Sequence, residues 1–192
     1  MNDVTHNWFR GFATSAMLVV VLWVVEIANA SLGYKLDFFG VYPRHVESLP
    51  GILVWPFLHA SAEHLILNTT PLFVLGYFVA LRGVVVFLQT LLLVTVIGGT
   101  GIWLFGRPAF HIGASGLVLG FFGFLIAVVL YERSLAAFGI ALFTVIYYGG
   151  LIMSIFPAAR FISWEAHAFG FCGGLVAARV LAIRPARRRR AP

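Results

Sequence analysis

The chain has 192 residues, of which 61% are hydrophobic and only 10% are charged, and its net charge is +6. A soluble globular domain carries about 25% charged residues, so this composition leaves too few polar groups to cover a surface that faces water. It excludes a soluble protein and predicts an integral membrane protein. Because a spanning helix needs roughly 20 mostly apolar residues, the length allows at most six or seven spans and no large soluble domain.

Six apolar segments follow one another along the chain, and each has the length of a transmembrane helix. Their approximate ranges are 12–32, 62–81, 84–105, 114–131, 135–154 and 166–183. They must be helical, because a bilayer cannot satisfy the hydrogen bonds of an open backbone. We therefore expect an all-α membrane protein with six transmembrane helices in a single domain over 1–192. Residues 33–61, with their prolines and aromatic side chains, are expected to form a structured interfacial loop.

The distribution of basic residues predicts the orientation in the membrane. With the N-terminus inside, nine of the 13 Lys and Arg residues fall on the inner side: Arg10, Arg82, Arg133, Arg179, Arg184 and Arg187 to Arg190. The other four are Lys35, Arg44, Arg107 and Arg160. Lys and Arg accumulate on the cytoplasmic side, so we expect a multi-pass protein of the cell (inner or plasma) membrane with both termini in the cytoplasm. The basic tail at 184–192 then faces anionic membrane lipid, and no nucleic-acid partner is expected.

The first segment has one alternative interpretation. Arg10, the apolar run after it and Ala28-Asn29-Ala30 are also typical of a cleavable signal peptide. The run continues to Ala28 with only Glu26 interrupting it, which is long for a signal core. This length favours an uncleaved first helix.

Polar side chains gather near the starts of the even-numbered segments. The members of this group are His59, His64, Asn68, His111, Ser115 and His167. Ionisable groups inside membrane spans are costly, which makes them functional candidates. Every even-numbered segment enters from the outer side in the predicted orientation. Four members, His64, Asn68, Ser115 and His167, are therefore expected at similar depth near that surface.

Glycines at helical spacing predict close packing of the fourth and sixth segments. They are Gly116, Gly120 and Gly123 on one segment and Gly170 and Gly174 on the other. Such small-residue faces let two membrane helices approach until their backbones almost touch. One face begins with Ser115 and the other with His167, so close approach brings a hydroxyl and an imidazole within hydrogen-bonding distance. A nucleophile and its base need this geometry, whereas the alternative is that the glycines only pack helices.

His64 and Asn68 are four residues apart and share one side of the second segment. Both can donate hydrogen bonds, as an oxyanion hole for acyl transfer requires. A satisfied interhelical hydrogen bond is the alternative role for this pair.

Metal binding is disfavoured, because Glu63 and Glu165 stand at no ligand-like spacing from the histidines. The single cysteine, Cys172, excludes a disulfide within the chain and a cysteine-based metal site, and it is expected to be a small packing residue. We expect neither a metal nor another cofactor.

No carboxylate stands where it could orient His167. Glu165 is two residues away and points to another side of a helix, so it is expected at the membrane interface. Glu26, near the outer end of the first segment, has no partner that the sequence identifies. The prediction is therefore a dyad of Ser115 and His167 without a third member.

Three motifs in order resemble the rhomboid family of bacterial intramembrane serine proteases. They are HASAEHLILN at 59–68, the G-x-S-G of Gly113 to Gly116, and AHAFGFCGG at 166–174. The resemblance covers essentially the whole chain and implies a six-transmembrane-helix rhomboid-like bundle. It differs at Leu119, one turn after the serine, where some members carry an aromatic residue.

The resemblance also implies an activity: hydrolysis of transmembrane protein substrates within or near their membrane segment. Ser115 would be the nucleophile and His167 the base and then the acid. His64, Asn68 and the backbone amide of Ser115 would form the oxyanion hole. The glycines that pack helices at the site would be Gly113, Gly116, Gly120, Gly170 and Gly174. A water-accessible cavity open to the outer side would be lined by the histidines, with His111 at its rim and outside the dyad. Substrate would enter laterally near the second and fifth segments.

Two other function classes stay open. The first is a catalytically inactive rhomboid-like protein that binds membrane clients, against which the presence of both Ser115 and His167 counts. The second is a small transporter or channel. The inner halves of the second, fourth and sixth segments are almost wholly apolar, which makes a polar path through the membrane the weaker hypothesis.

Overall fold

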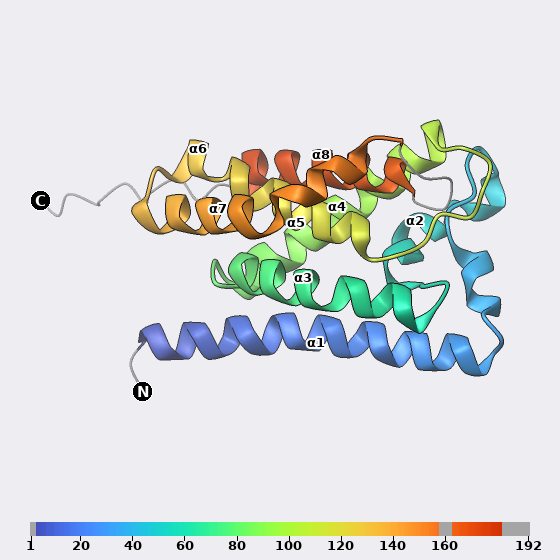
Figure 1. Ribbon diagram of the computed structural model, residues 1–192, viewed down its shortest axis with the longest axis horizontal. Coiled ribbons are helices and arrows are strands. Elements are labelled where there is room, and N and C mark those ends of the chain that lie inside the picture. The colour runs from blue at the N-terminus through green and yellow to red at the C-terminus, as the bar shows by residue number, and fades with distance from the viewer. Residues whose placement is uncertain (1–2, 158–162, 182–192) are drawn as a thin grey trace, which may run out of the picture.

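Six helices of 13 or more residues run through the computed structural model, which describes residues 3–157 and 163–181 (Figure 1). Their bounds are α1 Asp3–Ser31, α3 Ala62–Ala80, α4 Val84–Phe105, α5 Ser115–Ala127, α7 Leu135–Tyr148 and α8 Trp164–Leu181. The described ranges contain one isolated β-bridge and no strand, so the all-α fold class is confirmed. The predicted basic tail at 184–192 lies outside the described residues.

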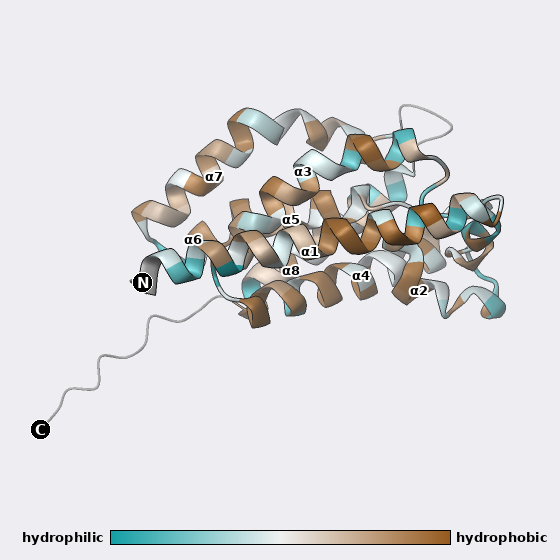
Figure 2. Cartoon of the chain, turned by 90° about the horizontal axis from the view of Figure 1, so that it is seen from below, coloured by the Kyte–Doolittle hydropathy of each residue, from teal (hydrophilic) through white to brown (hydrophobic). Residues whose placement is uncertain are grey.

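Four helical stretches in the described part of the chain are long and apolar enough to cross a bilayer. They are Thr5–Ser31, Val84–Phe105, Ser115–Glu132 and Leu135–Ile155. The third joins α5 to the short α6 (Val129–Glu132), and the fourth joins α7 to the 3-10 helix η4 (Gly149–Ile155). In Figure 2 hydrophobic residues cover much of the helix bodies, while hydrophilic residues gather mainly toward the two ends. These apolar helices indicate a multi-pass membrane protein.

Helix α5 is the central element of the bundle. It packs against α3, α4, α7 and α8, and nearly all of its side chains are buried. Helix α1 lies along one edge of the bundle beside α3 (Figure 1). The starts of α3, α5 and α8 lie toward the same end of the molecule, which we call the site end. The turn after α3 and helix α6 lie at the opposite end.

The contact between α5 and α8 depends on glycine. A Cβ atom added at Gly170 would overlap the carbonyl oxygen of Gly116, and one added at Gly174 would overlap that of Gly120. The two backbones therefore touch directly, as the small-residue faces predicted. This contact brings the first turn of α5 beside the first turns of α8.

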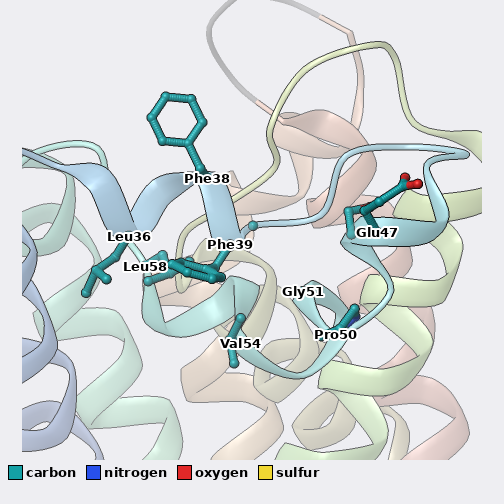
Figure 3. Close-up of a pocket in the computed structure, with 10 residues that line it drawn as sticks. Leu36, Phe38, Phe39, Glu47, Pro50, Gly51, Val54 and Leu58 are labelled. Carbon is teal, nitrogen blue, oxygen red and sulfur yellow. The ribbon is translucent and has the colours of Figure 1, made fainter.

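The segment between α1 and α3 is folded, with short helices η1 (Lys35–Phe39), η2 (Val46–Ser48), α2 (Gly51–Val54) and η3 (Trp55–Phe57). Trp55 is fully buried, and its Nε1 donates to the Thr95 carbonyl at 3.1 Å, which fixes the loop to α4. The loop carries an apolar pocket lined by Leu36, Phe39, Val54 and Leu58, among others (Figure 3). The loop is thus a structured part of the bundle.

The end of α1 is bonded to this loop through Asn29. Its Nδ2 donates to Oδ1 of Asp37 at 2.8 Å, and its Oδ1 accepts from the Leu36 amide at 3.0 Å. Glu26, for which the sequence identified no partner, is buried one turn earlier in the vicinity of Asp37 and Tyr34.

The expectation that Cys172 packs inside the bundle was wrong. Cys172 is exposed, whereas Gly170, Gly173, Gly174 and Ala177 are buried. Buried positions at this spacing define one inward stripe of a helix, and Cys172 falls outside it. The apolar run around it is therefore only partly a buried surface.

Candidate active site

The loop before Ser115 is held in place by its backbone amides. The Gly113 amide donates to the Trp55 carbonyl at 2.9 Å, and the Ala114 amide donates to Nε2 of His59 at 3.0 Å. Gly113 has a φ of +118°, which favours glycine, and a Cβ atom there would lie only 2.7 Å from the His64 ring. The loop can therefore make its turn and approach His64 only with glycine at this position.

Ser115 and His167 are hydrogen-bonded to each other. The distance between Ser115 Oγ and His167 Nε2 is 2.7 Å, and His167 is only 7% exposed. The close packing of Gly116 against Gly170 explains this contact, because each glycine lies within a turn of the corresponding site residue.

A backbone carbonyl orients the imidazole. His167 Nδ1 lies 3.0 Å from the carbonyl oxygen of Ser154, in η4. A carbonyl can only accept, so Nδ1 carries the proton and the lone pair of Nε2 is directed at Ser115. The Ser115 hydroxyl is therefore the donor to His167. A general base needs this tautomer, and the orienting group is usually a carboxylate in Ser-His-Asp sites.

His64 and Asn68 face the same cavity as Ser115 and His167, which has a volume of about 490 Å³. Asn68 Nδ2 donates to the His64 carbonyl of its own helix at 2.9 Å, which occupies one of its two amide hydrogens. The second amide hydrogen and the His64 ring remain available to a bound group. Leu119, the position at which the sequence differs from the family it resembles, also lines this cavity with an aliphatic side chain.

The start of α5 supplies backbone donors. The first helical amide with an acceptor behind it is that of Val118, which donates to the Ala114 carbonyl at 3.0 Å. The amides of residues 115–117 precede it and have no acceptor within an α-helix. Together with the positive end of the helix dipole, they favour a negative charge beside Ser115.

His59 is a site residue to which the sequence assigned no role. It is fully buried, and burial together with the nearby His64 lowers its pKa from 6.5 to about 3. It is therefore neutral at physiological pH and remains an acceptor for the Ala114 amide. The sequence could have identified His59 as a site residue through its position five residues before His64 in the motif HASAEHLILN. The Ser154 carbonyl gave no signal, because every residue type has one.

One sequence expectation at this end is corrected. His111 does not stand at the cavity rim: it is 2% exposed, with its ring bonded to Ser163 and Arg107, while its neighbours Phe110 and Ile112 line the cavity. Glu165 is 1% exposed and ion-paired with Arg107. Both residues belong to the packing between α8 and the loop before α5.

The family model of the Rhomboid domain matches residues 47–184, which include every residue of this site. The chain belongs to the rhomboid family. The resemblance identified in the three sequence motifs is thereby confirmed.

Relatives in mycobacteria extend the similarity beyond the motifs. The uncharacterized protein Rv1337 of Mycobacterium tuberculosis is 35% identical over 96% of this chain and 80% of its own length. The uncharacterized protein ML1171 of Mycobacterium leprae is 34% identical over 96% of this chain and 76% of its own length. These relatives match nearly the whole chain, including the first helix that lies before the family domain.

Proposed function

We propose that this rhomboid is an intramembrane serine endopeptidase that cleaves transmembrane proteins within or next to their membrane segment. The observation that carries the proposal is the continuous hydrogen-bonded series from Ser115 Oγ through His167 to the Ser154 carbonyl, inside a cavity of a multi-pass membrane protein. In the full proposal six helices cross the cell membrane, both termini are cytoplasmic, and the cavity opens to the outer side. No cofactor is needed for this chemistry.

The geometry supports a conventional acyl-transfer sequence. Ser115 Oγ attacks the scissile carbonyl carbon while its proton moves to Nε2 of His167. The imidazolium that forms is stabilised by the Ser154 carbonyl, which accepts from Nδ1–H. The proton then passes to the leaving amine nitrogen, and the C–N bond breaks. Water, activated by His167, hydrolyses the ester on Ser115 and restores the starting state.

The oxyanion of the tetrahedral intermediate needs donors on the cavity side of Ser115. The proposal assigns this role to the backbone amide of Ser115, the free amide hydrogen of Asn68 and the ring of His64. Preorganised donors of this kind commonly supply the largest part of transition-state stabilisation. The Ala114 amide cannot take part, because His59 already accepts its hydrogen.

The test is cleavage of a model transmembrane substrate by the purified protein in liposomes. Ser115→Ala is expected to abolish cleavage while the protein still accumulates. Ser31→Ala changes an exposed serine at the end of α1 and is the matched control. If both Ser115→Ala and the parent bind substrate but neither cleaves it, the chain is a rhomboid-like binding protein. If Ser115→Ala cleaves as fast as the parent, the assignment of the nucleophile is wrong.

A further inference from the structure

Polar contacts beyond the Ser115–His167 pair join the loop before α5 to the start of α8. Arg107 donates to Oε1 of Glu165 twice, from its backbone amide at 3.2 Å and from Nε at 3.2 Å. The Glu165 side chain is only 2% exposed, and that of Arg107 is 35% exposed. A buried carboxylate is thus held against one residue of the loop.

His111 and Ser163 form a second connection between the same two segments. His111 Nε2 lies 3.0 Å from the Arg107 carbonyl, which can only accept, so Nε2 carries the proton. Nδ1 therefore accepts the hydroxyl hydrogen of Ser163, with a separation of 2.6 Å. Burial lowers the pKa of His111, which keeps the ring neutral and this acceptor available at pH 7.

Ser163 also acts on its own helix. Its Oγ accepts from the Ala166 amide at 3.2 Å, in the manner of a helix N-cap. One hydroxyl therefore both begins α8 and fixes its first turn to the loop. Ser115 follows His111 by four residues, and His167 follows Ser163 by four residues. This second connection thus lies at the same short chain distance, four residues, from each of the two reacting groups.

The glycine contact alone does not determine the position of α8 along the axis of α5. Glycines let the α5 and α8 backbones touch, but a flat surface without side chains does not fix how far one helix slides along the other. Directional hydrogen bonds fix this register. A buried ion pair is weak evidence for stability, because desolvation opposes the attraction, so a role in specifying geometry accounts better for its presence.

We propose that Arg107, His111, Ser163 and Glu165 form a clamp that sets the register between the Ser115 loop and the His167 helix. Its members are positioning residues: Arg107, His111 and Glu165 are not among the residues that line the cavity. Ser163 does line it, and its hydroxyl is bonded to His111 and to the Ala166 amide. The inference rests on the proposed function, because its effect is read through the reactivity of Ser115.

The test compares Glu165→Gln and Ser163→Ala with a control pair at the opposite end of the bundle. Arg82 and Glu132 form an ion pair there, with side chains 10% and 15% exposed, so Glu132→Gln removes the same charge far from the site. The readouts are the rate constant for labelling of Ser115 by a fluorophosphonate, kcat and KM for a transmembrane substrate, and the Tm of the purified protein.

The clamp predicts a fall in labelling rate and in kcat of about 10- to 100-fold for both site-end variants, with KM unchanged, because a misplacement of about 1 Å has this effect. Ser163→Thr keeps the hydroxyl and is expected to restore most of the rate. Glu132→Gln is expected to lower the Tm and leave the labelling rate unchanged. Should Glu165→Gln fail to accumulate, Ser163→Ala and Ser163→Thr still decide the question, because they retain both charges.

Unchanged labelling in Glu165→Gln and Ser163→Ala, with a lowered Tm as in Glu132→Gln, would overturn the clamp and make these contacts structural only. The experiment distinguishes failure of the proposed function from failure of the clamp. A parent protein that is neither labelled at Ser115 nor active overturns the proposed function. A labelled, active parent with unaffected variants overturns the clamp alone.

Discussion

The two ends of the bundle contain the same kind of ion pair in different surroundings. At the site end Arg107 and Glu165 lie beside Ser163 and His111, near a cavity that holds a serine and histidines. At the opposite end Arg82 pairs with Glu132 and lies over the ring of Phe124, 5.7 Å from its centroid. Charged residues buried in a membrane protein are therefore not enough to mark a site. The convergence of a nucleophile, a base and donors on one cavity is what distinguishes the two ends.

The largest loss of activity is expected when a hydrogen-bond donor to the oxyanion is removed at the site end. Asn68→Ala is predicted to lower kcat by about 100- to 1000-fold with little change in KM, because an oxyanion donor acts mainly in the transition state. The measurement is the steady-state cleavage of a transmembrane substrate. Thr70→Ala, an exposed position two residues further along α3, is the control. A raised KM with unchanged kcat would mean that Asn68 binds substrate instead.

The glycine contact gives the next effect. Gly170→Ala is predicted to slow labelling of Ser115 by about 100-fold, because the added Cβ separates α8 from α5 and lengthens the distance from His167 Nε2 to Ser115 Oγ. Alanine favours a helix over glycine by about 1 kcal/mol, so helix propensity alone predicts that Gly170→Ala stabilises α8 and does not disturb the site. Gly139→Ala on α7, where nothing lies within 4 Å of the new Cβ, is expected to keep the full rate. Equal rates in both variants would show that the contact does not position the dyad.

The last prediction concerns the thermal stability of the protein at acid pH. The pKa of His59 is about 3 in the folded protein and 6.5 in the unfolded chain, so the unfolded chain binds the extra proton between these values. The contribution of neutral His59 to the free energy of unfolding is fully present above about pH 6.5 and is lost as the pH falls toward 3. It amounts to about 1.4 kcal/mol for each unit of difference between the two pKa values. The Tm of the parent should therefore fall more steeply on acidification than that of His59→Gln, whose amide oxygen can still accept the Ala114 hydrogen.

His45→Gln provides the comparison for this experiment, since it replaces an exposed histidine in the loop before α2. It should retain the slope of the parent. If His59→Gln has that slope as well, the buried histidine does not contribute to acid sensitivity.

Much of the fold could be predicted because the physical signals are local. Apolar length determined where helices occur, and Gly116, Gly120, Gly170 and Gly174 indicated which two helices touch, because only glycine permits that approach. The motifs around Ser115 and His167 indicated where reacting groups gather.

What could not be predicted depends on direction and on the backbone. His111 and Ile112 are neighbours in one loop, yet only Ile112 faces the cavity, and nothing in their order specifies which one does. The group that orients His167 is the backbone carbonyl of Ser154, and residue types do not reveal which backbone carbonyl takes such a role. The partner of Glu165 could not be predicted, because Arg107 lies 58 residues away in the chain.

The central claim is that His167 activates Ser115 as a nucleophile. The most direct measurement is mass spectrometry of the protein after reaction with a fluorophosphonate, in the parent, Ser115→Ala and His167→Ala. We predict an adduct on Ser115 in the parent, none in Ser115→Ala, and a rate at least about 1000-fold lower in His167→Ala. An adduct that forms equally fast without His167, or a folded parent that forms none, would contradict the account.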